Sequence, residues 1–287
     1  MGTGLGFAVA AALLYGTYLY VYKRYFSHLP AMAYLAVAEG AAALWYLPVA
    51  LDAWSADLAV SALDAGAVVV TALLTGVAIA LSIRAIQLGD VSYVTPLNKL
   101  VPLFVLPMEL LLLETVLAPL QIAGVLVATA GIYLANYEAG GLLAPFRRAL
   151  SYRPAQLALV GAAVFAVVDL LKRVLLQELS LPVPLVVWVS LVGITAVVAP
   201  FGWRQRGDLP RRVLPKLLAL GVVLALGDHL IALAFARLPA SVASPVVNAQ
   251  AVVAVLLGGL LLREAAFSRR LAASLLVVGG IALLALG

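Results

Sequence analysis

The chain has 287 residues, of which 65% are hydrophobic and 11% are charged, and its mean hydropathy is +1.14. Soluble domains contain about 45–50% apolar and about 25% charged residues, so this composition excludes a soluble globular domain and predicts an integral membrane protein. The formal net charge is +5, but the basic residues are scattered through short connections, which argues against a nucleic-acid partner. The absence of cysteine excludes disulfides, thiolate metal sites and cysteine nucleophiles.

Apolar runs follow one another along the chain, and each is long enough to cross a hydrocarbon core about 30 Å thick as a helix. Alternating strand patterns are absent from the sequence, so we expect an all-α integral membrane fold. The first run precedes Lys23 and Arg24 and follows no basic residue, the reverse of a secretory signal, so we expect it to be retained as a span. The predicted spans are ten: roughly 4–22, 31–51, 65–87, 91–113, 119–137, 155–176, 184–202, 214–236, 240–262 and 267–286.

The two halves of the chain resemble each other at a spacing of 149 residues. The segment 22–24 (YKR) recurs at 171–173 (LKR), and 91–97 (VSYVTPL) recurs at 240–246 (ASVASPV). Five spans per half is an odd number, so the second half must enter the membrane from the opposite side. The sequence therefore predicts two inverted five-helix repeats, at residues 1–138 and 155–287, joined by a connecting loop at 139–154.

Short motifs at matching places in both halves carry a family resemblance. They are Leu111–Glu114, Gln121, Gly124 and Gly131 in the first half, and Ala234–Pro245, Leu260–Glu264 and Gly279–Gly280 in the second. With these motifs the whole chain resembles the drug/metabolite transporter superfamily, in its ten-helix branch with paired EamA-type repeats. The resemblance implies a secondary carrier, often an exporter of amino acids or other small metabolites. It also implies a central cavity lined by the first four helices of each repeat.

The chain departs from that family at two places. Glu39 stands where relatives commonly carry an arginine, and Asp228 and His229 stand where relatives are usually uncharged. The substrate or the coupled ion is therefore expected to differ from that of better-known members.

A polar stripe occurs once in each half. The first copy is Ser92, Thr95 and Lys99, and the second is Ser241, Ser244 and Asn248, with spacings that place each set on one helix face. Burying an ammonium near the middle of a span costs about 2.5–3.5 kcal/mol, so Lys99 is expected to face a wet cavity or a carboxylate. We expect Lys99 and Asn248 to form the floor of a substrate site that the four hydroxyl residues line. The alternative for Lys99 is a structural ion pair within the bundle.

Three more ionisable residues lie deep in predicted spans. Asp228 is a candidate to bind a substrate amine, to balance Lys99 or to carry a proton, and the alternative is a neutral acid hydrogen-bonded between helices. His229 is a further coupling candidate, although adjacent helical residues point about 100° apart and cannot face one partner. Glu39 is a candidate for substrate binding or coupling, or for a fixed salt bridge.

Other polar residues are weaker candidates. Tyr15 and Tyr18 share a face of the first span, where they would bind an organic cation or simply pack between helices. Asp169, Lys172 and Arg173 are interpreted as a local acid–base group whose long side chains reach the membrane interface. Pro96 and Pro245 are expected to kink their spans, either as hinges or as static bends. Arg84 and Gln250 are the remaining candidates for a substrate contact.

The basic residues favour one side of the membrane. Fourteen of the 18 lysines and arginines lie at connections after odd-numbered spans, and the others are Lys99, Lys172, Arg173 and Arg237. The positive-inside rule would put the fourteen in the cytoplasm and both termini outside. The family resemblance implies cytoplasmic termini instead, and both orientations stay open.

Together these patterns predict a multi-pass protein of the cytoplasmic membrane that moves a small polar or zwitterionic metabolite by alternating access. An amino acid and the export direction are favoured. The alternatives are a carrier of anionic metabolites such as sugar phosphates, and a membrane-embedded lipid-handling enzyme that uses Asp228 and His229. No nucleophile elbow, metal-ligand spacing or nucleotide loop is present in the sequence, so we expect no catalysis, no metal and no cofactor. The expected partners are a small-molecule substrate and the lipid bilayer.

Overall fold

The computed structural model describes residues 2–54, 60–88, 97–136, 151–261 and 267–286, and every regular element among them is a helix. Lipid offers no water to backbone N–H and C=O groups, and a helix pairs these groups within its own segment. The predicted all-α membrane fold of ten helices in two inverted five-helix repeats is confirmed. Six helices of the described residues are long and apolar enough to cross a membrane by themselves, and shorter apolar helices complete the bundle.

The helices of the first repeat are α1 (Gly2–Tyr25), α2 (Ala31–Asp52), α3 (Ala62–Leu88), α5 (Val101–Leu112) and α6 (Pro119–Asn136). Those of the second repeat are α8 (Arg153–Arg173), α9 (Val183–Arg204), α10 (Leu214–Phe235), α11 (Ala240–Asn248), α12 (Gln250–Leu261) and α13 (Phe267–Leu286). A π-helical turn, Val174–Glu178, continues α8, and two short 3₁₀ turns, Arg206–Asp208 and Arg211–Val213, connect α9 to α10.

Prolines mark where several helices begin. Pro30, Pro182 and Pro239 immediately precede α2, α9 and α11, and Pro154 and Pro215 lie in the first turns of α8 and α10. The first turn of a helix has no intrahelical partner for its N–H groups, so a residue without an N–H costs nothing there. The local sequence therefore sets these starting points.

Small residues are prominent in the interior of the bundle, and many large apolar residues face outward. Ala38, Ala42 and Ala162 are fully buried, whereas Leu44 and Leu275 are more than 60% exposed. Packing between helices in lipid gains nothing from hiding leucine, because the lipid tails are equally apolar, but small residues let backbones approach closely. In α6 and α13, for example, a Cβ added at Gly124 would lie 2.8 Å from the carbonyl oxygen of Gly280.

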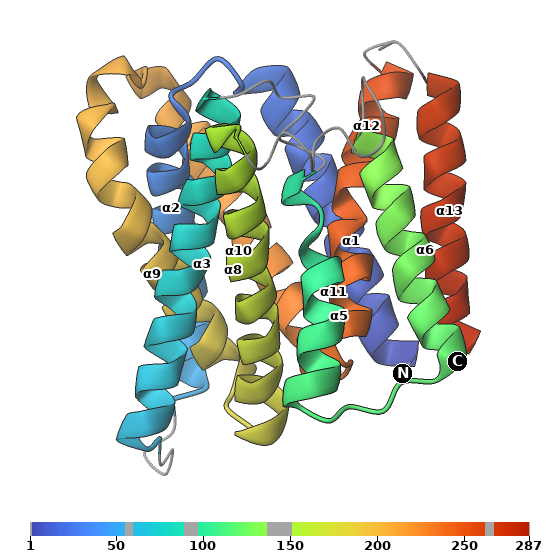
Figure 1. Cartoon of the computed structure of the whole chain (residues 1–287). Coiled ribbons are helices and arrows are strands. Elements are labelled where there is room, and N and C mark those ends of the chain that lie inside the picture. The colour runs from blue at the N-terminus through green and yellow to red at the C-terminus, as the bar shows by residue number, and fades with distance from the viewer. Residues whose placement is uncertain (1, 55–59, 89–96, 137–150, 262–266, 287) are drawn as a thin grey trace.

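The two repeats interlock rather than fold side by side. α2 packs against α9 and α10, and its counterpart in the second repeat, α9, packs against α2 and α3. α1 contacts α10 and α12, while α8 contacts α3 and α5, and α6 lies against α13 at one edge of the bundle (Figure 1). Each of these named contacts has a counterpart when the repeats are exchanged: α2–α10 corresponds to α9–α3, α1–α10 to α8–α3, and α1–α12 to α8–α5. Both chain ends lie at the same end of the bundle (Figure 1).

Two helices are interrupted at equivalent positions. In the first repeat Leu97 and Asn98 are helical, Lys99 lies in a turn, and α5 begins at Val101. In the second repeat α11 ends at Asn248 and α12 begins at Gln250. The two interruptions are 149 residues apart, and each carries one residue of the predicted pair Lys99 and Asn248.

These interruptions differ from the continuous spans predicted at 91–113 and 240–262, and each has a local cause. Pro102 lacks the N–H that would pair with the carbonyl of Asn98, which weakens the helix there and favours a break before α5. The side-chain amide of Asn248 donates to the carbonyl of Ser244 at 2.9 Å and competes there with the backbone donor. Ser92, Thr95 and Pro96 lie outside the described residues.

Candidate functional site

A cavity of about 340 Å³ lies between the two repeats and takes residues from both. Sites for small molecules commonly have volumes of about 300–1,000 Å³. The polar residues that line this cavity are Tyr15, Glu39, Thr75, Ser82, Asn98, Lys99, Asp169, Lys172, Asp228, Asn248 and Gln250. Apolar side chains such as Ile79, Phe165 and Phe235 complete the wall.

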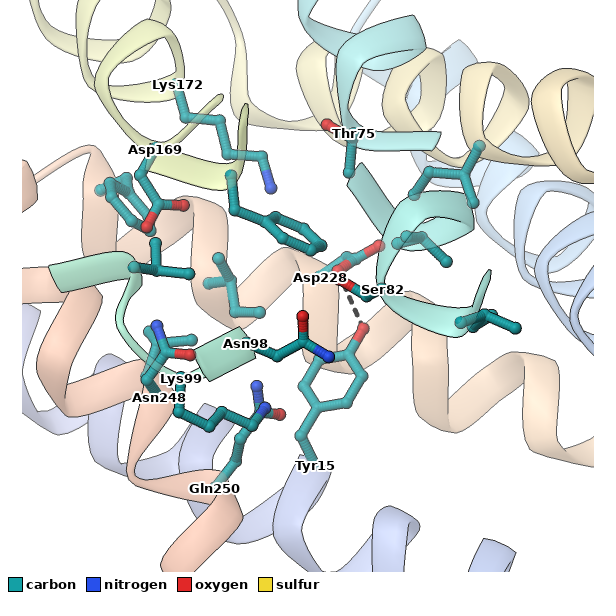
Figure 2. A pocket seen from close by; sticks show the side chains of 18 of the residues that line it. Tyr15, Thr75, Ser82, Asn98, Lys99, Asp169, Lys172, Asp228, Asn248 and Gln250 are labelled. Atoms are coloured by element: carbon teal, nitrogen blue, oxygen red, sulfur yellow. Dashed lines mark hydrogen bonds between the residues drawn. The ribbon is translucent and has the colours of Figure 1, made fainter. Parts of the chain in front are cut away.

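The two sides of the helix interruptions supply one part of the cavity. Asn98 and Lys99 come from the end before α5, and Asn248 and Gln250 flank the break between α11 and α12 (Figure 2). Lys99 has no ion pair with another described residue. The predicted meeting of Lys99 and Asn248 in one cavity agrees with this geometry, and the break brings Gln250 to the same wall.

Carboxylates from three other helices supply the rest of the charge. Glu39 comes from α2, Asp169 from α8 and Asp228 from α10. Lys172 acts electrostatically on all three carboxylates, and Glu39 and Asp228 act on each other. Figure 2 shows Lys172 extending from α8 toward the centre of the cavity.

Tyr15 holds Asp228 in place. Its hydroxyl donates to Oδ1 of Asp228 at 2.8 Å, the dashed line in Figure 2. The tyrosine ring lies directly on Gly227, where an added Cβ would be only 2.5 Å from the ring atom Cε2. The glycine before Asp228 thus makes room for the ring whose hydroxyl orients the carboxylate.

The structure corrects the interpretation of the Asp169 group. Asp169 and Lys172 are three residues apart and share the face of α8 that lines the cavity, so they are not surface residues reaching for the interface. Arg173 turns elsewhere and places its Nε 3.2 Å from Oε1 of Glu109. A carboxylate inside an apolar span was the available signal for Asp169, because such residues are costly unless a partner or a ligand needs them.

Several predicted residues lie away from the cavity. The hydroxyl of Tyr18 accepts a hydrogen bond from Tyr34 at 2.9 Å, and Nδ1 of His229 lies against the hydroxyl of Tyr46. Asp228 and His229 therefore serve different neighbours, as their adjacent positions on a helix require. Ser244 does not line the cavity itself, but its hydroxyl bonds to Asp169 and lies 3.4 Å from the amide of Asn248.

Ser241 belongs to a second polar cluster that the sequence did not reveal. Glu109 is completely buried and accepts hydrogen bonds from the N–H groups of Ala240 and Ser241, both at 2.7 Å, and from the Ser241 hydroxyl. With Arg173 this cluster, which we call the Glu109 cluster, ties α5 and the end of α8 to the first turn of α11. A carboxylate satisfies the free N–H groups at the start of a helix and offsets its positive end.

Comparisons with known proteins agree on the architecture. The sequence model of the EamA-like transporter family matches residues 2–137 and 153–286. No curated protein matches the chain. One solved structure, with the description "Crystal structure of protein", superposes with a TM-score of 0.80 over 99% of this chain and 98% of that chain, at 18% identity. At that identity the likeness concerns the fold alone.

Proposed function

The chain belongs to the EamA-like transporter family, and from this premise we propose that its cavity binds a small polar or zwitterionic metabolite and carries it across the cytoplasmic membrane. A small molecule and the surrounding lipid are then its working partners. The proposal names an amino acid as the favoured substrate class and export as the direction, the latter because the resembled family often exports such compounds.

The observation that carries the proposal is the set of charges of both signs in one cavity. Lys99 and Lys172 offer ammonium groups, and Glu39, Asp169 and Asp228 offer carboxylates. An amino acid carries a carboxylate and an ammonium group, so such a wall complements both of its ends. A sugar phosphate fits less well, because the carboxylates in the cavity outnumber the lysines.

Two features support alternating access. The main contacts between the two repeats have counterparts when the repeats are exchanged, and such symmetry would allow two equivalent arrangements around a central site. In the Glu109 cluster, hydrogen bonds join α5 to α11 across the repeat boundary, and such bonds can break and re-form as the ends of a cavity open in turn.

The lipid-handling alternative finds less support. It would use Asp228 and His229 together, but Asp228 accepts from Tyr15 while His229 lies against Tyr46. A pair of catalytic groups has to reach the same proton or the same reacting atom.

Purified protein in sealed liposomes tests the proposal. We expect counterflow of labelled amino acids in wild type and a loss of about ten- to a hundredfold in apparent affinity in Lys99→Ala, since a charged hydrogen bond contributes about 1.5–3 kcal/mol. Lys216→Ala is the matched control, because this lysine is exposed and lies outside the cavity. Equal transport by both variants would remove Lys99 from the site. Turnover of a lipid in detergent would replace transport by enzymatic activity.

A further inference from the structure

The charges of the cavity do not balance, and this imbalance bears on the substrate. Three carboxylates face two lysines: Glu39, Asp169 and Asp228 against Lys99 and Lys172. None of these five groups lies within 4.0 Å of an opposite charge in the part of the chain that the structure describes, where the ion pairs found belong to Arg173. The cavity charges are thus not closed into fixed salt bridges.

Lys172 is shared among the three carboxylates of the cavity and is not paired with one of them. Asp169 and Lys172 are three residues apart on α8, share its cavity face, and interact electrostatically. Glu39 on α2 and Asp228 on α10 have no basic neighbour on their own helices in the cavity, and Lys172 acts on both of them from α8. The cavity as a whole therefore holds one carboxylate more than it holds ammonium groups.

The hydrogen-bond acceptors of the cavity also lack donors. Glu39 is only 6% exposed, and its Oε2 has no hydrogen-bond partner among the described residues; the same holds for Oδ1 of Asn98. Among the described residues, the hydrogen bond found for the Asp228 carboxylate is the one that its Oδ1 accepts from the Tyr15 hydroxyl. A buried acceptor without a donor costs about 1–3 kcal/mol, and more when it is charged, so these oxygens are sites for a ligand that brings N–H groups.

We infer that the cavity takes an amino acid with a second amino group, a cationic α-amino acid of the lysine or ornithine kind; this inference rests on the proposed function. Its carboxylate lies at Lys99, beside the amides of Asn248 and Gln250. Its two ammonium groups lie at Glu39 and Asp228. This ligand brings the net charge of the filled cavity to zero, whereas a neutral amino acid leaves one carboxylate without a counter-charge in a site walled by lipid-embedded helices.

Three probes of matched shape test the inference on the full chain in detergent, by isothermal calorimetry and by thermal stabilisation. L-norleucine has the carbon skeleton of L-lysine without the second amino group, and cadaverine has it without the carboxylate. We expect L-lysine to bind at least about tenfold more tightly than either, as the loss of one charged contact of about 1.5 kcal/mol requires.

Norleucine binding as tightly as lysine would overturn the inference and leave amino-acid transport standing. Cadaverine binding as tightly as lysine would overturn the role given to Lys99. If none of the three binds, the inference fails, and the wider amino-acid panel of the transport assay decides separately whether the proposed function fails with it.

Changing one cavity carboxylate provides the second arm. Glu39→Gln keeps the side-chain shape, removes one negative charge, and is expected to lower the preference for lysine over norleucine by about tenfold or more. Asp228→Asn is a second variant with the same expected shift, in case either protein folds poorly. Asp208→Asn removes the same charge from the connection between α9 and α10 and is expected to keep the wild-type preference. An unchanged preference in both cavity variants would overturn the inference.

Discussion

At the scale of single residues, the site depends on contacts between side chains far apart in the chain. Tyr15 reaches Asp228 across 213 residues, and it does so because Gly227 leaves space for its ring. The tyrosine hydroxyl donates to one carboxylate oxygen of Asp228. A small residue next to an acid thus positions that acid through a third side chain.

Gly227→Ala tests this arrangement. The added methyl group would meet the Tyr15 ring, so we expect a displaced ring, a destabilisation of about 1–3 kcal/mol and weaker ligand binding. Gly279→Ala is the control, because a Cβ there has no neighbour within 4 Å and alanine favours the helix by about 0.5–1 kcal/mol. Melting temperatures and calorimetry of both variants measure the effects. Wild-type affinity in Gly227→Ala would show that the position of the ring does not matter.

At the scale of helices, a buried carboxylate at one end of α5 secures the start of α11. Glu109→Ala would leave two N–H groups of α11 without an acceptor and Arg173, 12% exposed, without its carboxylate. Removing one partner of a buried ion pair costs about 3–5 kcal/mol, so we expect a large loss of stability.

The matched variant for this helix contact is Glu178→Ala. Glu178 is the other acid near Arg173, at 3.5 Å, but it is 56% exposed, and such pairs contribute about 0–1 kcal/mol. Chemical unfolding of the two variants in detergent compares them directly. Equal losses would mean that the Glu109 cluster contributes no more than a surface contact.

At the scale of the whole molecule, ten crossings place both chain ends on one side and the basic connections on the other. Ser27, after the first span, and Ser180, after the sixth, are exposed and lie at opposite ends of the bundle. Because the chain has no cysteine, Ser27→Cys and Ser180→Cys each introduce a single thiol. The charge bias predicts that a membrane-impermeant maleimide labels Cys at 180 in intact cells and Cys at 27 only after lysis. The reverse pattern would establish cytoplasmic termini, as the family resemblance implies.

Much of the architecture could be predicted from the sequence, and part of the site could be. Apolar length and the 149-residue repeat predict the helices and the inversion, and the repeated stripe contains Lys99 and Asn248, which the structure brings to one cavity. The same stripe included Ser241, which instead binds Glu109. Both outcomes come from one spacing rule, because the rule finds a shared helix face but does not say which neighbour that face meets.

The sequence by itself determined that this chain is a bundle of membrane helices built from two inverted halves. In lipid each span has to pair its backbone internally, so a stretch of about 20 residues is enough to specify its own structure. The tertiary structure alone decided that Glu39, Asp169 and Asp228 share a cavity with two lysines and that Glu109 anchors α11. The rotation of each helix about its axis depends on the packing of helices distant in the chain, and no local spacing contains that information.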